Sequence, residues 1–554
     1  MFHLQKAGKG TLTMQNENSK SSLAGSEVGS SSLDRRTFLE FLCAGAAGLS
    51  LPSLAGCTTS QKKTKKKSDG LRASTTDKLR TLPGIHHKVV IEWKDKISDH
   101  AHFGFNNDFV AFIKLPSGEA IMMVNHESVN PTFLGTSLDS EMRSLNDVTR
   151  EQKEVGVSLV HMKKTKRGWR PKKQSKYNRR IDGTVDIPFS SGFMVAGRKS
   201  ARGTLANCAG GVTPWGTFLT CEENFDQFYD VVDRHNRQVH RPKDSLRWST
   251  AMNLPSEHYG WVVEIEPISG KAEKKIALGR FAHEGATTVV ARDGRCVVYM
   301  GDDANSECIY KFISNTPGQL DNGTLYVLNI EAGKWIALER SMHPVLQARF
   351  KSQTEVFIYA REAAKLVGGS PMNRPEDIEI HPLTGEIFVA LTNNSDAGDD
   401  HGSILKIQES ENDYLSLDCA LSEFLVCGPK IGLSCPDNLL FDPKGNLWIT
   451  NDISGKKIEK GPYKGLGNNA LFFVATSGPE AGVPVRVVEA PMDAELTGPA
   501  WSPDMTSLFL SVQHPGETTK DAHKPTSLWP NGKSPVPAVV EVSLKGTRFA
   551  PANV

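Results

Sequence analysis

The sequence predicts an all-β protein, a six-bladed β-propeller with irregular insertions and one short helical insertion. The first observation is that six segments share one plan, in which a polar motif, a strand, a turn, a strand and a second polar motif follow each other. The second is that runs rich in Val, Ile, Leu and Phe flank Gly, Pro or Asp turns, which is the signal of a β-hairpin. Six hairpins around one axis make a propeller, although a β-sandwich would also contain hairpins.

Each hairpin is justified by its two polar motifs and its central turn. The first motifs are HFGFNND (102–108), NCAGG (207–211), HEGA (283–286), RPED (374–377), CPDN (435–438) and LTGP (496–499). The turns are centred on Gly118, Gly216, Gly294, Gly385, Gly445 and Met505, which are 60 to 98 residues apart. A regular four-stranded blade recurs at roughly 40–50 residues, so these blades carry long insertions.

The segments between the hairpins complete the expected domain of residues 81–554. Residues 131–200 are expected to be irregular, with a solvated basic run at 163–173, and residues 339–366 show helical spacing. A last strand at 537–544 is expected to close the ring. The net charge of +2 gives no electrostatic argument for nucleic acid, and we expect a monomer. The nine cysteines lack the spacing of a disulfide scaffold or a zinc finger.

The N-terminal 80 residues read as a leader and a tether. Residues 1–33 are polar and expected to be disordered, and DRRTFL (34–39) begins a segment, 34–57, that resembles a twin-arginine export signal. LAGC (54–57) resembles a lipobox with Cys57 as the lipidated residue, the alternative being a plain signal-peptidase site. A Lys-rich linker follows at 58–80. We therefore expect export by the twin-arginine translocase, to the periplasm or to a membrane anchor facing outside the cytoplasm.

Both polar motifs of a hairpin meet at one face, because a hairpin starts and ends on the same edge. The metal-binding side chains expected there are Glu127, Cys221, Glu222, Glu223, Glu284, Asp302, Asp303, Glu376, Asp377, Asp437, Asp452 and Glu495. So many carboxylates cannot all be ionised close together without cations. Oxygen-rich clusters suit Ca²⁺, whereas a thiolate among carboxylates suits a transition metal such as iron. The alternative is that the acids are ordinary solvated loop ends.

Arg374 lies two residues before Glu376, so in extended backbone the two side chains share one side. A guanidinium beside a metal-bound carboxylate suits phosphate binding, because its fork matches phosphate oxygens. The alternative is a structural ion pair between Arg374 and Glu376.

The motifs together resemble the PhoX-type alkaline phosphatases. The resemblance runs in order from about residue 103 to 517 and rests on FGFNNDF, NCAGGVTPWGTFLTCEEN, LGRFAHEGA, GDDANSECIYKF, RPEDIEI, CPDNLLFDPKGNLWITND and ELTGPAW…VQHPGE. It implies a six-bladed propeller that binds iron (Fe³⁺) and Ca²⁺ and cleaves phosphate monoesters outside the cytoplasm. The lipobox and the basic run at 163–173 depart from the family pattern.

The resemblance also implies roles for single residues. Cys221 would be an iron ligand, Glu284 and Glu376 metal ligands, and Arg374 the group that binds the substrate phosphate, with Arg374 and Glu376 as catalytic residues. Four further metal ligands, not divided between iron and calcium, would be Glu222, Asp302, Asp303 and Glu495.

Two other functions fit the same pattern. One is a non-catalytic, lipid-anchored propeller whose calcium ions brace its loops for binding a partner. The other is a propeller hydrolase of a different ester, such as a lactonase, which would use calcium without needing a thiolate.

Overall fold

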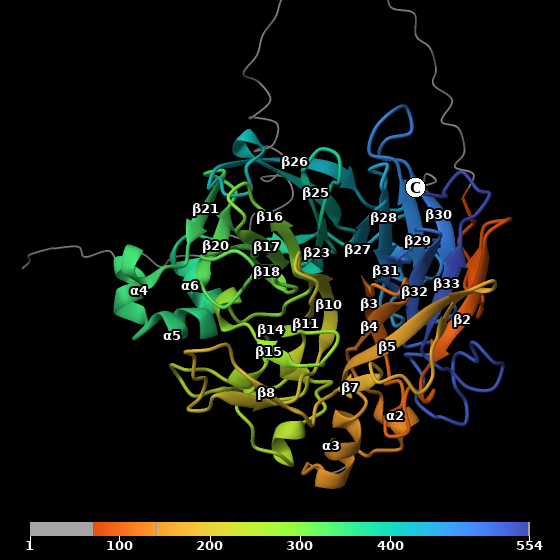
Figure 1. The fold of residues 1–554 in the computed structure, drawn as a ribbon, viewed down its shortest axis with the longest axis horizontal. Coiled ribbons are helices and arrows are strands. Elements are labelled where there is room, and N and C mark those ends of the chain that lie inside the picture. Colours follow the sequence, from red (N-terminus) through yellow and green to blue (C-terminus); the bar gives the residue numbers. More distant parts are fainter. Residues whose placement is uncertain (1–69, 139–140, 552–554) are drawn as a thin grey trace, which may run out of the picture. The chain divides into compact units, whose positions relative to one another are not determined.

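The computed structural model describes residues 70–138 and 141–551. Within these ranges, six antiparallel sheets of four or five strands are arranged as the blades of a β-propeller (Figure 1). The predicted fold class is therefore confirmed. All six predicted hairpins form the two inner strands of the six blades.

The blades follow each other along the chain. The first contains β3 (Asn107–Lys114), β4 (Ala120–His126), β5 (Gly156–Thr165), β6 (Gly168–Pro171) and β7 (Arg179–Ile181), and the second β10 (Asn207–Val212), β11 (Phe218–Glu222), β14 (Val262–Ile265) and β15 (Ala272–Lys274). The third contains β16 (Thr287–Val290), β17 (Cys296–Gly301), β19 (Ile309–Ser314), β20 (Gly323–Asn329) and β21 (Lys334–Ala337). The fourth contains β23 (Pro375–Ile380), β24 (Ile387–Leu391), β25 (Ser403–Glu409) and β26 (Cys419–Val426).

The last two blades recruit strands from the start of the described chain. The fifth contains β27 (Pro436–Phe441), β28 (Leu447–Asn451), β29 (Ala470–Val474), β30 (Pro484–Glu489) and β1 (Arg80–Thr81). The sixth contains β31 (Glu495–Trp501), β32 (Ser507–Gln513), β33 (Ala538–Ser543) and β2 (His86–Glu92). The last strand expected at 537–544 is β33, and it closes the ring by pairing with β2 (Figure 1).

The inner strands form a closed circle in which β3, β10, β16, β23, β27 and β31 each contact the next, and β31 contacts β3. Apolar side chains fill the spaces between neighbouring blades. Ile121 and Val157 of the first blade, for example, pack with Phe218 and Val263 of the second. Each such side chain contributes about 1.5–3 kcal/mol when fully buried, so packing between blades holds the inner strands in place around the axis.

The region 131–200 differs from the irregular stretch that we expected. Besides α2 (Pro131–Leu134) and α3 (Leu145–Gln152), it contains β5, β6 and β7, which complete the first blade. The basic run lies on the β5–β6 hairpin, where the exposed Lys163 and Lys164 follow the buried Met162. Because lysines follow the apolar half of this strand directly, the sequence pattern of the region predicted a solvated loop.

The predicted helical insertion is present. It contains α4 (Pro344–Arg349), α5 (Gln353–Ile358) and α6 (Ala360–Leu366). Ser352 caps α5 by accepting a hydrogen bond from the backbone N–H of Glu355. Val356, Ala360 and Ala363 are buried against the third blade and its neighbours.

The twin-arginine motif, Cys57 and the polar segment 1–33 lie outside the described residues. The described end of the predicted linker is bound to the fifth blade, because the Leu71 N–H donates to the Arg486 carbonyl at 2.9 Å and β1 pairs with β30. Among the residues that the structure describes, no helix is long and apolar enough to cross a membrane.

Candidate active site

The first polar motif of most hairpins contains a kink in the strand. In four inner strands the pairing register shifts directly after the first paired residue, between Asn107 and Val110, Asn207 and Gly210, Pro375 and Ile378, and Pro436 and Leu439. Such β-bulges re-aim side chains and often lie next to active sites. The residue that follows the first paired position is Asp108, Cys208, Glu376 or Asp437, and Glu284 follows the isolated bridge of His283 to Asp302.

The second polar motif places a further side chain at the same end of each blade. The residues that directly follow the paired end of the second strand are Glu127, Glu223, Asp303, Thr392, Asp452 and His514. All except Thr392 line one pocket together with the first-motif residues, whereas Asn393, the residue after Thr392, lines the adjoining pocket. The hairpin argument is thus confirmed, since both motifs meet at one face.

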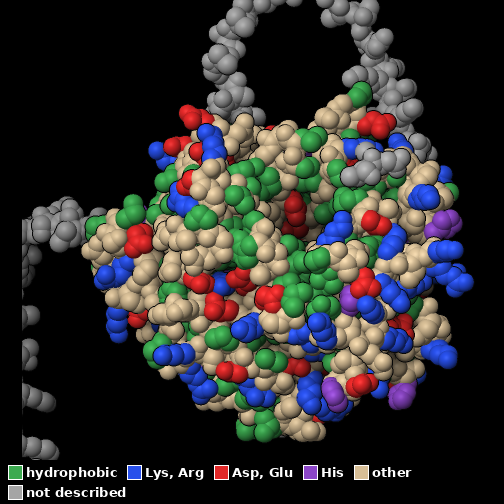
Figure 2. Space-filling model, viewed as in Figure 1, with side chains coloured by type: hydrophobic (Ala, Val, Ile, Leu, Met, Phe, Trp, Pro, Cys, Tyr) green, Lys and Arg blue, Asp and Glu red, His purple; other side chains and the backbone are tan. Residues whose placement is uncertain are grey.

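The shared cavity, here called the mouth pocket, has a volume of about 470 Å³. Besides the residues named above, its acidic lining includes Asp244, Glu495 and Glu517, and Arg374 and Lys456 are its basic side chains. The space-filling view shows acidic side chains deep in a hollow near the centre of the viewed face, while basic and acidic groups alternate over the outer surface (Figure 2).

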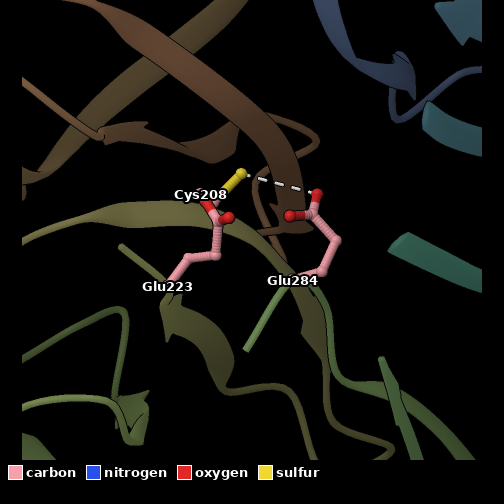
Figure 3. Close-up of side chains that lie close together, drawn as sticks. All are labelled: Cys208, Glu223 and Glu284. Carbon is pink, nitrogen blue, oxygen red and sulfur yellow. Dashed lines mark hydrogen bonds between the residues drawn. The ribbon is translucent and has the colours of Figure 1, made fainter. Parts of the chain in front are cut away.

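Two groups of potential metal ligands lie in the mouth pocket and share Glu284. The first consists of Cys208, Glu223 and Glu284, and the second of Glu284, Glu376 and Asp437. Within each group one ligand atom from every residue lies within 4.8 Å of the others. Figure 3 shows the first group, in which the Cys208 thiol donates to Glu284 Oε1 at 3.4 Å.

Burial and mutual repulsion oppose ionisation of these groups. Both effects raise the pKa of Glu284 and of Glu223 well above that of an ordinary carboxyl. Burial, with the nearby Asp108 and Glu284, raises the pKa of the Cys208 thiol. Burial raises the pKa of Asp437 to about 7. Bound cations would reverse these shifts, and a thiol beside carboxylates is a donor set that fits metal ions.

Arg374 faces this acidic pocket and is paired with two of its acids. Its Nε and Nη2 donate to the two carboxylate oxygens of Asp303 at 2.8 and 2.7 Å, and Nη2 lies 2.8 Å from Glu376 Oε1. The remaining nitrogen, Nη1, makes no hydrogen bond to any described residue, so it is available to a ligand in the pocket. Arg374, which directly precedes Pro375, has a φ of 51°. This is a strained backbone conformation for a residue other than glycine.

Of the predicted site residues, Arg374, Glu376, Glu284, Asp303 and Glu495 line the mouth pocket. Cys221 does not. Its side chain is fully buried in an apolar cluster with Leu219 and Trp261, where burial raises the thiol pKa. The physical reason is the alternation of β11, which turns Cys221 toward the packing side of the sheet.

Glu222 and Asp302 are also directed away from the pocket and are held by cations. Glu222 accepts from Lys274 Nζ at 2.6 Å, and both side chains are fully buried. Asp302 forms a two-bond ion pair with Arg361. These two acids precede the mouth residues Glu223 and Asp303 by one position, so their side chains point to the other side of the strand and pair with the cations there.

Cys208 and Asp108 are mouth residues that the sequence reasoning missed. Aligning the first motifs of the hairpins on their paired residue would have found them, because Cys208 occupies the position of Asp108, Glu284, Glu376 and Asp437. The equivalent position of the sixth hairpin is Gly498, where an added Cβ would lie 2.6 Å from the Cα of Phe109.

The comparisons with known proteins identify the family. The family model described as alkaline phosphatase PhoX matches residues 67–516. The chain belongs to this family. PhoX alkaline phosphatases are phosphomonoesterases, and the resemblance noted from the motifs is confirmed over most of the chain.

A solved PhoX structure agrees with the described fold. The chain is similar to Pseudomonas fluorescens PhoX in complex with vanadate, with 29% identity and a TM-score of 0.76, covering 86% of this chain and 97% of that one. It is also similar to a protein of unknown function from Dyadobacter fermentans, with 11% identity and a TM-score of 0.43, covering 83% and 99%. No curated protein matches the sequence.

Proposed function

We propose that this chain is a metal-dependent alkaline phosphatase that releases inorganic phosphate from phosphate monoesters outside the cytoplasm. The observation that supports this most is that Arg374, with one free nitrogen, lies against a buried set of acids and one thiol in a single pocket. Membership of the PhoX family supports the reaction class.

The metal ions belong in the two groups that share Glu284. Cys208 with Glu223 and Glu284 offers a thiolate, which suits iron, whereas Glu284 with Glu376 and Asp437 offers only oxygen, which suits Ca²⁺. When bound, such ions neutralise phosphate charge and stabilise the charge of the phosphoryl group being transferred. Asn438, whose Nδ2 lies 3.4 Å from Glu284 Oε1 and 3.3 Å from Asp437 Oδ1, holds the shared carboxylate beside its neighbour.

Arg374 binds and orients the phosphate. Its Nε–Nη2 edge is fixed by Asp303, so the guanidinium plane is set before the substrate arrives and Nη1 donates to a phosphate oxygen. A fixed donor of this kind stabilises developing charge without having to reorganise. The similar structure of P. fluorescens PhoX is a complex with vanadate, a transition state analogue, which supports the proposal that this chain binds phosphate.

The decisive assay is hydrolysis of p-nitrophenyl phosphate from pH 5 to pH 10. The protein is purified from cytoplasm supplied with iron and calcium, and is assayed with and without a calcium chelator. We expect alkaline activity that the chelator abolishes and added Ca²⁺ restores. A folded, metal-loaded protein without turnover would refute the phosphomonoesterase and favour the binding propeller. Full activity without iron would favour a calcium-only hydrolase.

The proposed location rests on DRRTFL (34–39) and Cys57. A folded protein that carries metal needs an export route for folded cargo, which the twin-arginine translocase provides. Replacing Arg35 and Arg36 with lysine is expected to leave active enzyme in the cytoplasm, as measured by cell fractionation. Replacing Cys57 with serine is expected to release activity from the membrane fraction.

A further inference from the structure

A second cavity, here called the side pocket, adjoins the mouth pocket at Arg374. It has a volume of about 320 Å³ and shares only Arg374, Asp452 and Ser454 with the mouth pocket. None of the five residues of the two metal-ligand groups lines it. A phosphate held by Arg374 with its reacting side toward those groups therefore has the side pocket behind it.

The side pocket lies where the ring of ionisable mouth residues is interrupted. The position after the second strand holds Glu127, Glu223, Asp303, Asp452 or His514 in five blades, but the neutral Thr392 in the fourth, where the neutral Asn393 follows it. Asn393 Nδ2 donates to Cys435 Sγ at 3.3 Å and to the Tyr463 hydroxyl at 3.4 Å. Its Oδ1 accepts no hydrogen bond from any described residue.

Apart from Ile453, the remaining lining is polar and electrically balanced. Arg374 and Lys457 are opposed by Asp396 and Asp452, and Asn305, Ser395 and Ser454 add neutral hydrogen-bonding groups. Among the described residues, the Lys457 ammonium makes no ion pair. Such a wall offers several donors and acceptors but no net charge and little apolar surface, which matches a ligand with several hydroxyl groups.

We propose that the side pocket binds the alcohol portion of the phosphate monoester and favours neutral, polyhydroxylated alcohols, such as glycerol or a sugar, over alkyl alcohols. This inference rests on the proposed phosphatase function. Asn393 Oδ1 accepts from a hydroxyl of the leaving alcohol, while Asn305 and Lys457 contact the hydroxyls nearer the pocket entrance. The chemistry is ordinary monoester hydrolysis, in which water supplies the proton that the departing alcohol takes up.

The mouth pocket contains the competing location. Phe105, Phe133 and Leu138 form an apolar wall away from the side pocket. An alcohol bound against that wall would be recognised by its apolar surface rather than by its hydroxyls, so the two locations predict opposite substrate preferences.

The test compares glycerol 1-phosphate with n-propyl phosphate, which has the same carbon chain without the two hydroxyls. In the wild-type enzyme we expect a higher kcat/KM for the glycerol ester. Asn393→Leu, which removes the amide at nearly constant volume, is expected to lower the ratio of the two kcat/KM values about tenfold, chiefly through KM of the glycerol ester. Asn305→Tyr, which fills the exposed entrance, is expected to lower the same ratio.

Asn315→Tyr is the matched control, because Asn315 is exposed and follows the end of β19 away from the mouth. The ratio should stay at the wild-type value in this variant. A ratio unchanged by Asn393→Leu and Asn305→Tyr, or changed instead by Phe133→Ala, would overturn the proposal. If the wild-type protein does not hydrolyse p-nitrophenyl phosphate at all, the proposed phosphatase function is refuted instead. Failure of the side-pocket proposal and failure of the phosphatase function are therefore distinguishable.

Discussion

The two central cysteines of the second blade give the sharpest test of the site. Both belong to the β10–β11 hairpin, but Cys208 lines the mouth pocket and Cys221 lies in the apolar core. Replacing each with alanine removes one sulfur atom from the same hairpin. The two variants therefore separate a role in metal binding from a role in packing.

The magnitudes follow from the two environments. Cys221 is fully buried, so Cys221→Ala should cost about 1–2 kcal/mol of unfolding free energy from lost burial and a small cavity, and should leave activity per folded molecule unchanged. Cys208 borders the pocket, so its replacement should change the unfolding free energy of the metal-free protein by less than about 0.5 kcal/mol. The same replacement should lower kcat/KM by about 10²–10³-fold, since charge stabilisation in the site is lost.

Three measurements decide between these roles. They are thermal unfolding of metal-free protein, iron content by mass spectrometry, and p-nitrophenyl phosphate hydrolysis normalised to folded protein. A Cys221→Ala protein that loses iron and activity, beside a Cys208→Ala protein that retains both, would refute the assignment of the mouth thiol.

Three further predictions concern groups around the site. Lys274→Met leaves the fully buried Glu222 carboxylate without its cation, so unfolding free energy should fall by about 3–5 kcal/mol, and an unchanged melting temperature would contradict the structural role. Arg374→Lys loses the guanidinium fork that binds Asp303, so kcat/KM should fall by about 10²-fold while the melting temperature stays near the wild-type value. Steady-state kinetics and thermal unfolding measure these two quantities, and a kcat/KM equal to that of the wild-type enzyme would exclude the phosphate role. Burial lowers the pKa of His258 from 6.5 to about 4, so on acidification the imidazole binds a proton in the unfolded chain before it does so in the folded one. The free energy of unfolding should therefore decrease by up to about 3 kcal/mol as the pH falls from 6.5 to 4. His258→Phe should flatten this part of the plot of unfolding free energy against pH.

The blade pattern was predictable from sequence because its signal is local. Each inner hairpin has apolar runs on both sides of a tight turn, and the least typical turn, at Met505, adopts the same left-handed conformation (φ 55°) as the glycines that it replaces. The outer strands were less predictable. β5 carries Lys163 and Lys164 on its exposed half, and β2 pairs with a strand some 450 positions away, which no local pattern reveals.

The site was predictable as a face, but only in part as a set of side chains. Which of two neighbouring acids turns inward depends on a single step of strand alternation, so Glu222 and Glu223 could not be separated without the register. The choice between Cys208 and Cys221 depends on a bulge, because the extra residue between Asn207 and Gly210 re-aims one side chain. The same position holds an acid in four of the other hairpins. Comparing the hairpins with one another, and not each motif alone, would have shown this.

The pairing of β2 with β33 makes completion of the circle depend on both ends of the domain. β2 precedes the other strands of its blade in the chain, but its partner consists of residues 538–543, so the sixth blade lacks its outer strand until β33 has been synthesised. The contact of β3 with β31, which brings the acids of the first and sixth blades together, likewise joins segments that lie far apart in the chain. The mouth pocket therefore takes its final shape only when strands from both ends of the described propeller have come together.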